Sequence, residues 1–248
     1  LQGDWSSDVC SSDLAKFVLK TLPGIDRPAI ASLFPTTRGE SVMLDLGANV
    51  QCGTDNLVQF AIMGEVFART VLGLEQPSVA LLNVGSEEMK GHEELRAAAA
   101  WLRETHLPIR FHGFVEGDDV PAGTVDVVVT DGFTGNIALK IAEGTAKLYS
   151  GFLKGAFSSS LLAKIGYLFA RSALTKVRLR TDPRRYNGAM FVGLNGIVVK
   201  SHGGTDALGF ANALGVAIDM ITHGLNDKIR DELAHLAPPP PAAEAAAV

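Results

Sequence analysis

The chain has 248 residues, 47% hydrophobic and 20% charged, a composition that supplies a buried core for one large domain. Its net charge of -5 argues against a nucleic-acid-binding protein. No apolar run reaches the roughly 20 residues that a membrane-spanning helix needs. Two cysteines, Cys10 and Cys52, indicate neither a disulfide framework nor a metal site. We therefore expect a soluble protein of the reducing cytoplasm.

The two ends of the chain differ from its middle. Residues 1–14 have neither a helical nor a strand period and lack the features of a signal peptide. We interpret them as a foreign segment, similar to a translated sequencing adaptor. Residues 237–248 form a Pro/Ala tail for which we expect disorder. An α/β domain, incomplete at its N-terminus, is expected over 15–236.

The middle alternates short apolar runs with helical patterns. Three runs end abruptly in small and polar residues: Val42–Asn49, Val79–Glu87 and Val125–Asn136. Such runs are typical of strands buried on both faces. We predict helices over 15–22, 55–72, 93–105 and from about 135, and strands over 29–34, 41–46, 79–83, 109–113 and 125–130. This order predicts an α/β fold with a three-layer, mostly parallel Rossmann-like sheet and helices on both faces.

Polar residues follow the predicted strands where a site is expected. In open parallel sheets ligands bind at the carboxyl ends of strands, where helix N-termini present N–H groups to anions. Five polar residues lie there: Asn49, Asn83, Asp131, Thr134 and Asn136. The turn before the apolar run Ile137–Leu139 resembles an anion cradle, although its small residues could instead let helix and strand pack closely.

The same segments carry a family resemblance. Six strings, in order, resemble the bacterial phosphate acyltransferases of the PlsX family: Gly24–Ala29, Asp45–Val50, Leu57–Gly64, Leu82–Gly91, Val128–Asn136 and Tyr186–Gly203. The resemblance extends from about Ala15 to about Asn226. Members of that family also carry an N-terminal portion with two glycine-rich turns that this sequence lacks, so the resemblance implies an N-terminally truncated chain.

The resemblance implies transfer of a long-chain fatty acyl group from acyl carrier protein to inorganic phosphate, giving acyl phosphate for phospholipid synthesis. It also implies a homodimer, attached peripherally to the inner face of the cell membrane, that supplies a membrane glycerol-3-phosphate acyltransferase. No cofactor or metal is expected. Phosphate is already an anionic nucleophile, so positioning and charge stabilisation could carry the rate.

Two alternatives stay open beside this function. The first is a catalytically silent fragment that retains dimerisation or binding to a membrane or to acyl carrier protein, since missing strands would expose a sheet edge. The second is a short-chain phosphate acetyl- or butyryltransferase.

Residue roles follow from the resemblance and from strand ends. Three residues are predicted to be catalytic: Lys200, His202 and Asn136. Five are predicted to bind substrate: Asn49, Asn83, Lys90, Asp131 and Thr134. Lys200 and His202 follow an apolar run, so Lys could neutralise phosphate and His could protonate the leaving thiolate. His202 could instead hold a tight turn, and Lys90 could be a solvated surface charge.

A basic segment lies between Thr145 and Arg185. It holds nine basic residues and one acidic residue, a net charge of +8 that leaves -13 for the rest of the chain. We predict a protruding amphipathic helix here and assign six membrane-binding residues: Leu161, Lys164, Ile165, Leu168, Phe169 and Arg171. The helix could bind an anionic membrane surface, dock the acidic acyl carrier protein, or pack against another subunit. The resemblance favours the first two.

Overall fold

The computed structural model describes residues 15–235 except 106, 108, 181, 183, 185, 187, 202 and 203. The predicted foreign segment 1–14 and the predicted tail 237–248 lie outside the described residues, as does the predicted catalytic His202.

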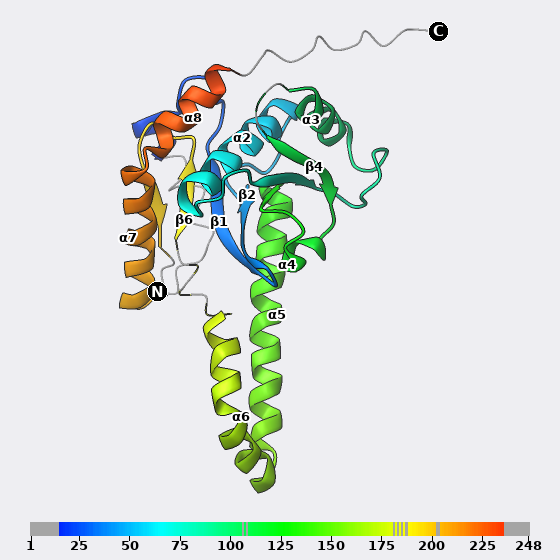
Figure 1. The fold of residues 1–248 in the computed structure, drawn as a ribbon, viewed down its shortest axis with the longest axis vertical. Coiled ribbons are helices and arrows are strands. Elements are labelled where there is room, and N and C mark those ends of the chain that lie inside the picture. The colour runs from blue at the N-terminus through cyan, green and yellow to red at the C-terminus, as the bar shows by residue number, and fades with distance from the viewer. Residues whose placement is uncertain are drawn as a thin grey trace.

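The described residues form a seven-stranded sheet with the order β4-β3-β5-β2-β1-β6-β7 (Figure 1). Its strands are β1 (Ala29–Thr36), β2 (Gly39–Leu44), β3 (Ser78–Leu82), β4 (Arg110–Val115), β5 (Val127–Val129), β6 (Ala189–Val192) and β7 (Val198–Lys200). The α/β class is as predicted, but the sheet is mixed and not mostly parallel. The pairs from β4 to β2 are parallel, whereas β2-β1, β1-β6 and β6-β7 are antiparallel.

Short connections explain the antiparallel half of the sheet. Only residues 37–38 separate β1 from β2, and only residues 193–197 separate β6 from β7. A parallel pair needs a crossover of a dozen or more residues, so these short turns must reverse the chain.

Seven helices, α2 to α8, accompany the sheet in the described part of the chain. They are α2 (Thr54–Val71), α3 (Glu93–Glu104), α4 (Asp119–Ala122), α5 (Gly132–Ser158), α6 (Leu161–Arg180), α7 (Ala207–Thr222) and α8 (Leu225–Ala234). The helix predicted over 15–22 is helical over 15–19 and ends at Lys20, whose φ is 60°. Predicted helix 55–72 corresponds to α2.

One face of the sheet, here called the closed face, carries most of the core. Its strand side chains include Val42, Leu44 and Val127, and they pack against apolar side chains of α2, α3 and α8. Strand residues alternate between the two faces, so neighbouring side chains such as Met43 and Val128 point the other way. That second surface, here called the open face, is met by α4 and the beginning of α5.

Helices α5 and α6 form a hairpin that extends away from the sheet (Figure 1). The rings of Phe157 and Tyr167 contact each other edge to face between the two helices, with their centroids 5.5 Å apart. No residue of α6, whose whole length is described, is buried. The apolar side chains along its predicted face are all exposed: Leu161, Leu162, Ile165, Leu168 and Phe169.

Candidate functional site

A buried carboxylate organises the loop after β2. Asp45 is fully buried, and its oxygens accept hydrogen bonds from the backbone N–H groups of Ile30 (2.9 Å), Ala48 (3.0 Å) and Asn49 (2.7 Å). Burial raises the pKa of Asp45 above its usual value, while these hydrogen bonds oppose the shift. The carboxylate therefore fixes the loop against β1.

Asn49 belongs to this loop architecture. Its amide nitrogen donates to the Pro28 carbonyl at 2.8 Å and to Asp45 at 2.9 Å, and the residue is buried. Both donor hydrogens are thus occupied by protein acceptors. This geometry supports a structural role for Asn49 and gives no support to the predicted substrate contact.

The turn after β5 begins α5 three residues earlier than predicted. Asp131 is the N-cap, and its carboxylate accepts hydrogen bonds from the backbone N–H and the hydroxyl of Thr134, both at 2.8 Å. The helix consequently starts at Gly132. Because Asp131 already occupies this helix N-terminus, the predicted anion cradle is partly filled by the protein's own carboxylate.

Glycine at two positions lets α5 approach the loop after β2. A methyl group at Gly132 would lie 2.6 Å from the Asn49 carbonyl oxygen, and one at Gly135 would lie 1.9 Å from the Asp45 carbonyl oxygen. The Gly132 N–H also donates to Asn49 O at 2.8 Å. Close packing, the alternative explanation for these small residues, therefore holds at both positions.

Asn136 joins the same contact. Its amide nitrogen donates to the Leu46 carbonyl oxygen at 3.1 Å, which ties the second turn of α5 to the loop after β2. This hydrogen bond supports a structural role for Asn136, and the predicted catalytic role stays a prediction.

Asn83 and Lys90 close a second loop, after β3. The Asn83 amide donates to the Lys90 carbonyl oxygen at 3.2 Å, and its own oxygen accepts from the Val84 N–H at 2.8 Å. Asn83 still lines the groove described next, whereas the Lys90 side chain is exposed and does not line it. A solvated surface charge is thus the better account of Lys90.

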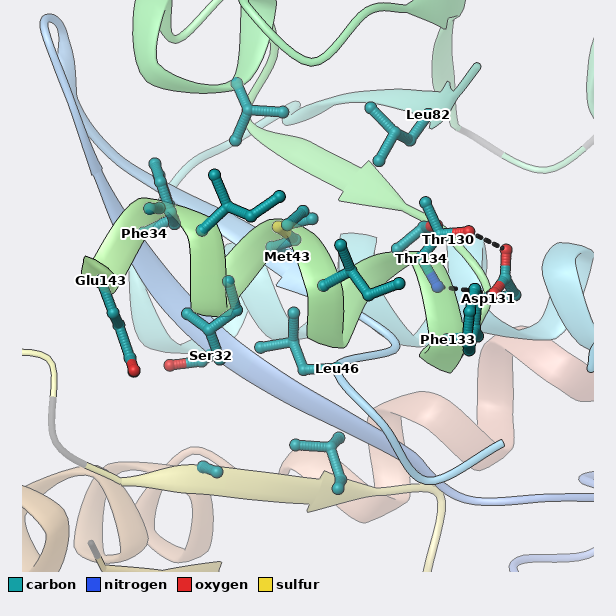
Figure 2. Close-up of a pocket in the computed structure, with 18 of the residues that line it drawn as sticks. Ser32, Phe34, Met43, Leu46, Leu82, Thr130, Asp131, Phe133, Thr134 and Glu143 are labelled. Carbon is teal, nitrogen blue, oxygen red and sulfur yellow. Dashed lines mark hydrogen bonds between the residues drawn. The ribbon is translucent and has the colours of Figure 1, made fainter. Parts of the chain in front are cut away.

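A groove of about 2580 Å³ runs between α5 and the open face of the sheet. Figure 2 shows Asp131, Phe133 and Thr134 at one end of the α5 segment, Ser32, Phe34 and Glu143 at the other, and Met43 and Leu46 between helix and sheet. Of the predicted site residues, the groove brings together Asn83, Asp131, Thr134 and Lys200 along its length.

Lys200 lies at the opposite end of the sheet from Asp131, contrary to prediction. Strand β7 is antiparallel to β6, β6 to β1 and β1 to β2, so β7 runs opposite to β2, β3 and β5. Its carboxyl end therefore points away from the ends of β3 and β5. Four strand spacings, about 19 Å, also separate β7 from β5. Partial burial lowers the pKa of Lys200.

Arg27 is a cation at the Asp131 end that the sequence analysis did not assign. It lines the groove, donates to the Gln51 carbonyl oxygen at 3.4 Å and pairs with Asp26 at 3.3 Å. Charges of both Arg27 and Asp131 act on Cys52, so the three lie at one end. Arg27 belongs to the string Gly24–Ala29, which was the available signal.

His92 and Cys52 also line this end of the groove. His92 Nδ1 lies 3.0 Å from a Glu94 carboxylate oxygen. Burial, followed by the charge of Asp45, raises the pKa of the Cys52 thiol to about 12, so it is a poor nucleophile at neutral pH. Among the residues that the structure describes, no group of three or more His, Cys, Asp or Glu side chains could hold a metal ion.

Membrane-spanning potential is confined to one pair of helices in the described part of the chain. No single helix is long and apolar enough to cross a bilayer, whereas α7 and α8 together meet the length and composition criteria but are bent by 50°.

Comparison with known proteins identifies the family. The family model described as fatty acid synthesis protein matches residues 11–228. The phosphate acyltransferase of Paramagnetospirillum magneticum is 72% identical over 225 residues, which are 91% of this chain and 64% of that protein. That of Rhodospirillum centenum is 74% identical over 223 residues, 90% of this chain and 63% of that protein. The chain thus spans slightly less than two thirds of these relatives.

A solved structure has the same fold. The EutD phosphotransacetylase from Staphylococcus aureus superimposes with a TM-score of 0.50 at 17% sequence identity, covering 90% of this chain and 58% of that one. This similarity supports the α/β fold. From the family match over 11–228 and the sequence identity to these relatives, the chain belongs to the fatty acid synthesis protein family, which includes the phosphate acyltransferases that its sequence strings resemble.

Proposed function

We propose that this chain carries the acyl-transfer site of a phosphate acyltransferase, which moves a long-chain acyl group from acyl carrier protein to inorganic phosphate. The names of relatives 72% and 74% identical support the reaction. One structural observation carries the proposal: a single groove combines Arg27, Asn83 and Thr134 at one end with an apolar lining along α5. Such a groove suits an anionic acceptor together with an aliphatic chain.

In the proposed reaction a phosphate oxygen attacks the thioester carbonyl carbon. A C–O bond forms, the C–S bond breaks, and the thiolate of the carrier protein leaves and takes up a proton. Arg27 would hold the phosphate dianion. The Thr134 hydroxyl now donates to Asp131, so it would exchange that hydrogen bond for one to phosphate or to the developing oxyanion when substrate binds. His92 is an added candidate for protonating the thiolate, beside the predicted His202.

Lys200 receives a different role in this proposal. Since β7 runs opposite to β5, we assign Lys200 to the far end of the groove and not to the reacting phosphate. Asn49 and Asn136 would act by holding the loops that carry the reacting end.

The test is acyl phosphate formation from long-chain acyl carrier protein and phosphate, trapped with hydroxylamine. Arg27→Met should lower kcat/KM by about 100-fold, mostly through the KM for phosphate, because it removes the cation beside the acceptor. Arg96→Met, an exposed α3 substitution outside the groove, is the control. Equal rates for the two variants would contradict the assignment of Arg27. The assay should also be run on the chain extended to the length of its relatives.

We further propose that the α5–α6 hairpin attaches the protein peripherally to an anionic membrane surface at the inner face of the cell membrane. The exposed apolar side chains of α6 beside Lys164 and Arg171 support this role. The double variant Leu161→Glu, Phe169→Glu should lose sedimentation with anionic vesicles while keeping its thermal unfolding midpoint. Unchanged sedimentation would contradict it, and zwitterionic vesicles provide the control.

The same basic side chains could instead receive the acidic acyl carrier protein. Carrier-protein binding that survives the double variant, but weakens when Lys164 and Arg171 become neutral, would favour that partner. A homodimer and a downstream membrane glycerol-3-phosphate acyltransferase stay predictions of the resemblance.

A further inference from the structure

Helix α5 is buried only at its beginning, and further along it Ala138 and Leu139 pack half-buried against the open face. Gly132 and Gly135 are buried in the first turn, whereas Phe133, Ile137 and Ile141 are 60%, 43% and 63% exposed. The glycines bring the backbone against the loop after β2, and the larger side chains that follow do not reach a comparable depth. The helix and the open face therefore enclose a groove that begins at the reacting end.

The groove has an apolar zone, defined here by the apolar lining side chains of α5 from Phe133 to Glu143 and those of the sheet side that face them. The helix contributes Phe133, Ile137 and Ile141, and the sheet side contributes Met43 and Leu46 (Figure 2). Ser32, which pairs with Met43 across the β1–β2 ladder, and Glu143 both line the groove, and Figure 2 shows them, with Phe34, toward the end of the α5 segment that is far from Asp131.

Beyond Glu143 the lining changes character. The groove continues past five polar or basic side chains, with Ala146, Tyr149 and Tyr186 among them: Thr145, Lys147, Ser150, Arg184 and Lys200. Glu143 comes nine positions after Thr134 along the helix, so the apolar zone is about 13 Å long. With C–C bonds of about 1.5 Å, an extended alkyl chain of about ten carbons covers this distance.

We propose that the apolar zone holds the acyl chain, with its carbonyl at Thr134, and that Glu143 sets the chain length at which further methylenes stop contributing to binding. This inference rests on the proposed function, whose reacting end it shares. An acyl chain fits this zone because the apolar lining begins beside Arg27 and Thr134, where phosphate is proposed to bind, and reaches the carboxylate of Glu143. Alkyl carbons beyond that point would displace water from Glu143 and Ser32, a cost that contacts with Phe34, Ala146 and Tyr149 would offset only in part.

The probe is a series of linear alkyl phosphonates with about six to about sixteen carbons, titrated by calorimetry. Each methylene that enters the zone should raise affinity about 3- to 4-fold. We expect this increase up to about ten carbons and a nearly constant affinity for longer chains. Affinity that does not depend on chain length would overturn the proposal, and would fit a groove covered by another protein segment or a second copy.

Two variants with matched controls sharpen the test. Glu143→Leu should let affinity keep rising beyond ten carbons, whereas Lys140→Leu, which breaks the same 3.8 Å ion pair but does not line the groove, should leave the limit unchanged. Ile137→Glu should abolish the chain-length dependence. Leu148→Glu, on the same helix at 53% exposure and outside the lining, should preserve it.

The outcomes separate this inference from the proposed function. If the protein forms acyl phosphate but its phosphonate affinities are the same in Glu143→Leu and Ile137→Glu as in the wild type, the acyl-chain site is overturned and the reaction is not. If phosphonate affinity depends on chain length and changes in both variants, but no version of the protein forms acyl phosphate, the acyl-chain site is supported and the reaction is overturned.

Discussion

The two faces of the sheet are covered by helices in very different ways. On the closed face α2 buries thirteen of its 18 residues, Phe60 and Phe67 among them. On the open face α5 buries only Gly132 and Gly135 along its described length of 27 residues. Apolar burial supplies most of the favourable free energy of folding, so stability is concentrated on one face. The other face is thereby left free to form a groove.

The largest expected effect compares one phenylalanine from each face. Phe60→Ala removes a fully buried ring from α2 and should lower the free energy of unfolding by about 3 to 5 kcal/mol. Phe133→Ala removes a ring that is mostly exposed on α5, and the change should stay within about 0.5 kcal/mol. Urea unfolding midpoints measure both. Equal losses would contradict the unequal division of stability between the faces.

An ionic contact on the closed face predicts a dependence on pH. Glu65 of α2 pairs with Arg69 at 2.8 Å, and Arg69 pairs with Glu232 of α8 at 2.6 Å. Burial raises the pKa of Glu65 to about 7, although Arg69 opposes the shift. A carboxyl with a raised pKa binds its proton more tightly in the folded state, so its contribution is complete below the unfolded pKa and is lost as pH rises through about 7.

The free energy of unfolding should therefore fall by about 2.5 kcal/mol between about pH 5 and about pH 8 through Glu65 alone. Chemical denaturation of the wild type and of Glu65→Gln at both pH values isolates this contribution, because all other groups titrate in both proteins. The variant should show a flatter pH dependence. The same slope in both would mean that Glu65 stays ionised throughout.

A pair of glycines on α5 tests how the groove is made. Gly135→Ala should destabilise by about 1 to 3 kcal/mol, because its methyl group would meet the Asp45 carbonyl oxygen. Gly144→Ala, on the same helix with open space around it, should stabilise by about 0.5 to 1 kcal/mol through helix propensity. Thermal unfolding separates the signs. Stabilisation by both substitutions would show that α5 does not depend on close contact at its first turn.

Local patterns predicted the elements whose character is set by their own residues. The helix predicted over 55–72 is α2, and the strands predicted over 41–46, 79–83 and 125–130 overlap β2, β3 and β5. Strand direction is different in kind, because it depends on the turn and on the neighbouring strand. The run before Lys200 therefore predicted a strand correctly, yet its antiparallel course moved Lys200 to the other end of the groove.

The candidate site was predictable in position and less so in its contacts. Asp131 and Thr134 lie at the end of β5 and line the groove, as their place after an apolar run indicated. Asn49 and Asn136 follow strands in the same way, yet both donate to backbone carbonyls. A short polar side chain at a strand end can satisfy either a ligand or a nearby loop, and sequence spacing does not distinguish the two.

Asn136 offers the smallest and most discriminating test, because a ligand contact and a structural contact predict opposite results. Asn136→Ala leaves the Leu46 carbonyl oxygen without its side-chain donor and should cost about 1 kcal/mol of stability. Acyl phosphate formation per folded molecule should then change by less than about twofold. Thr134→Val removes a hydroxyl that lines the groove. Its rate of acyl phosphate formation should fall by more than the loss of folded protein explains. A large loss of activity in Asn136→Ala with an unchanged unfolding midpoint would return this side chain to the reacting end, and α5 would then have to shift at its second turn when substrate binds.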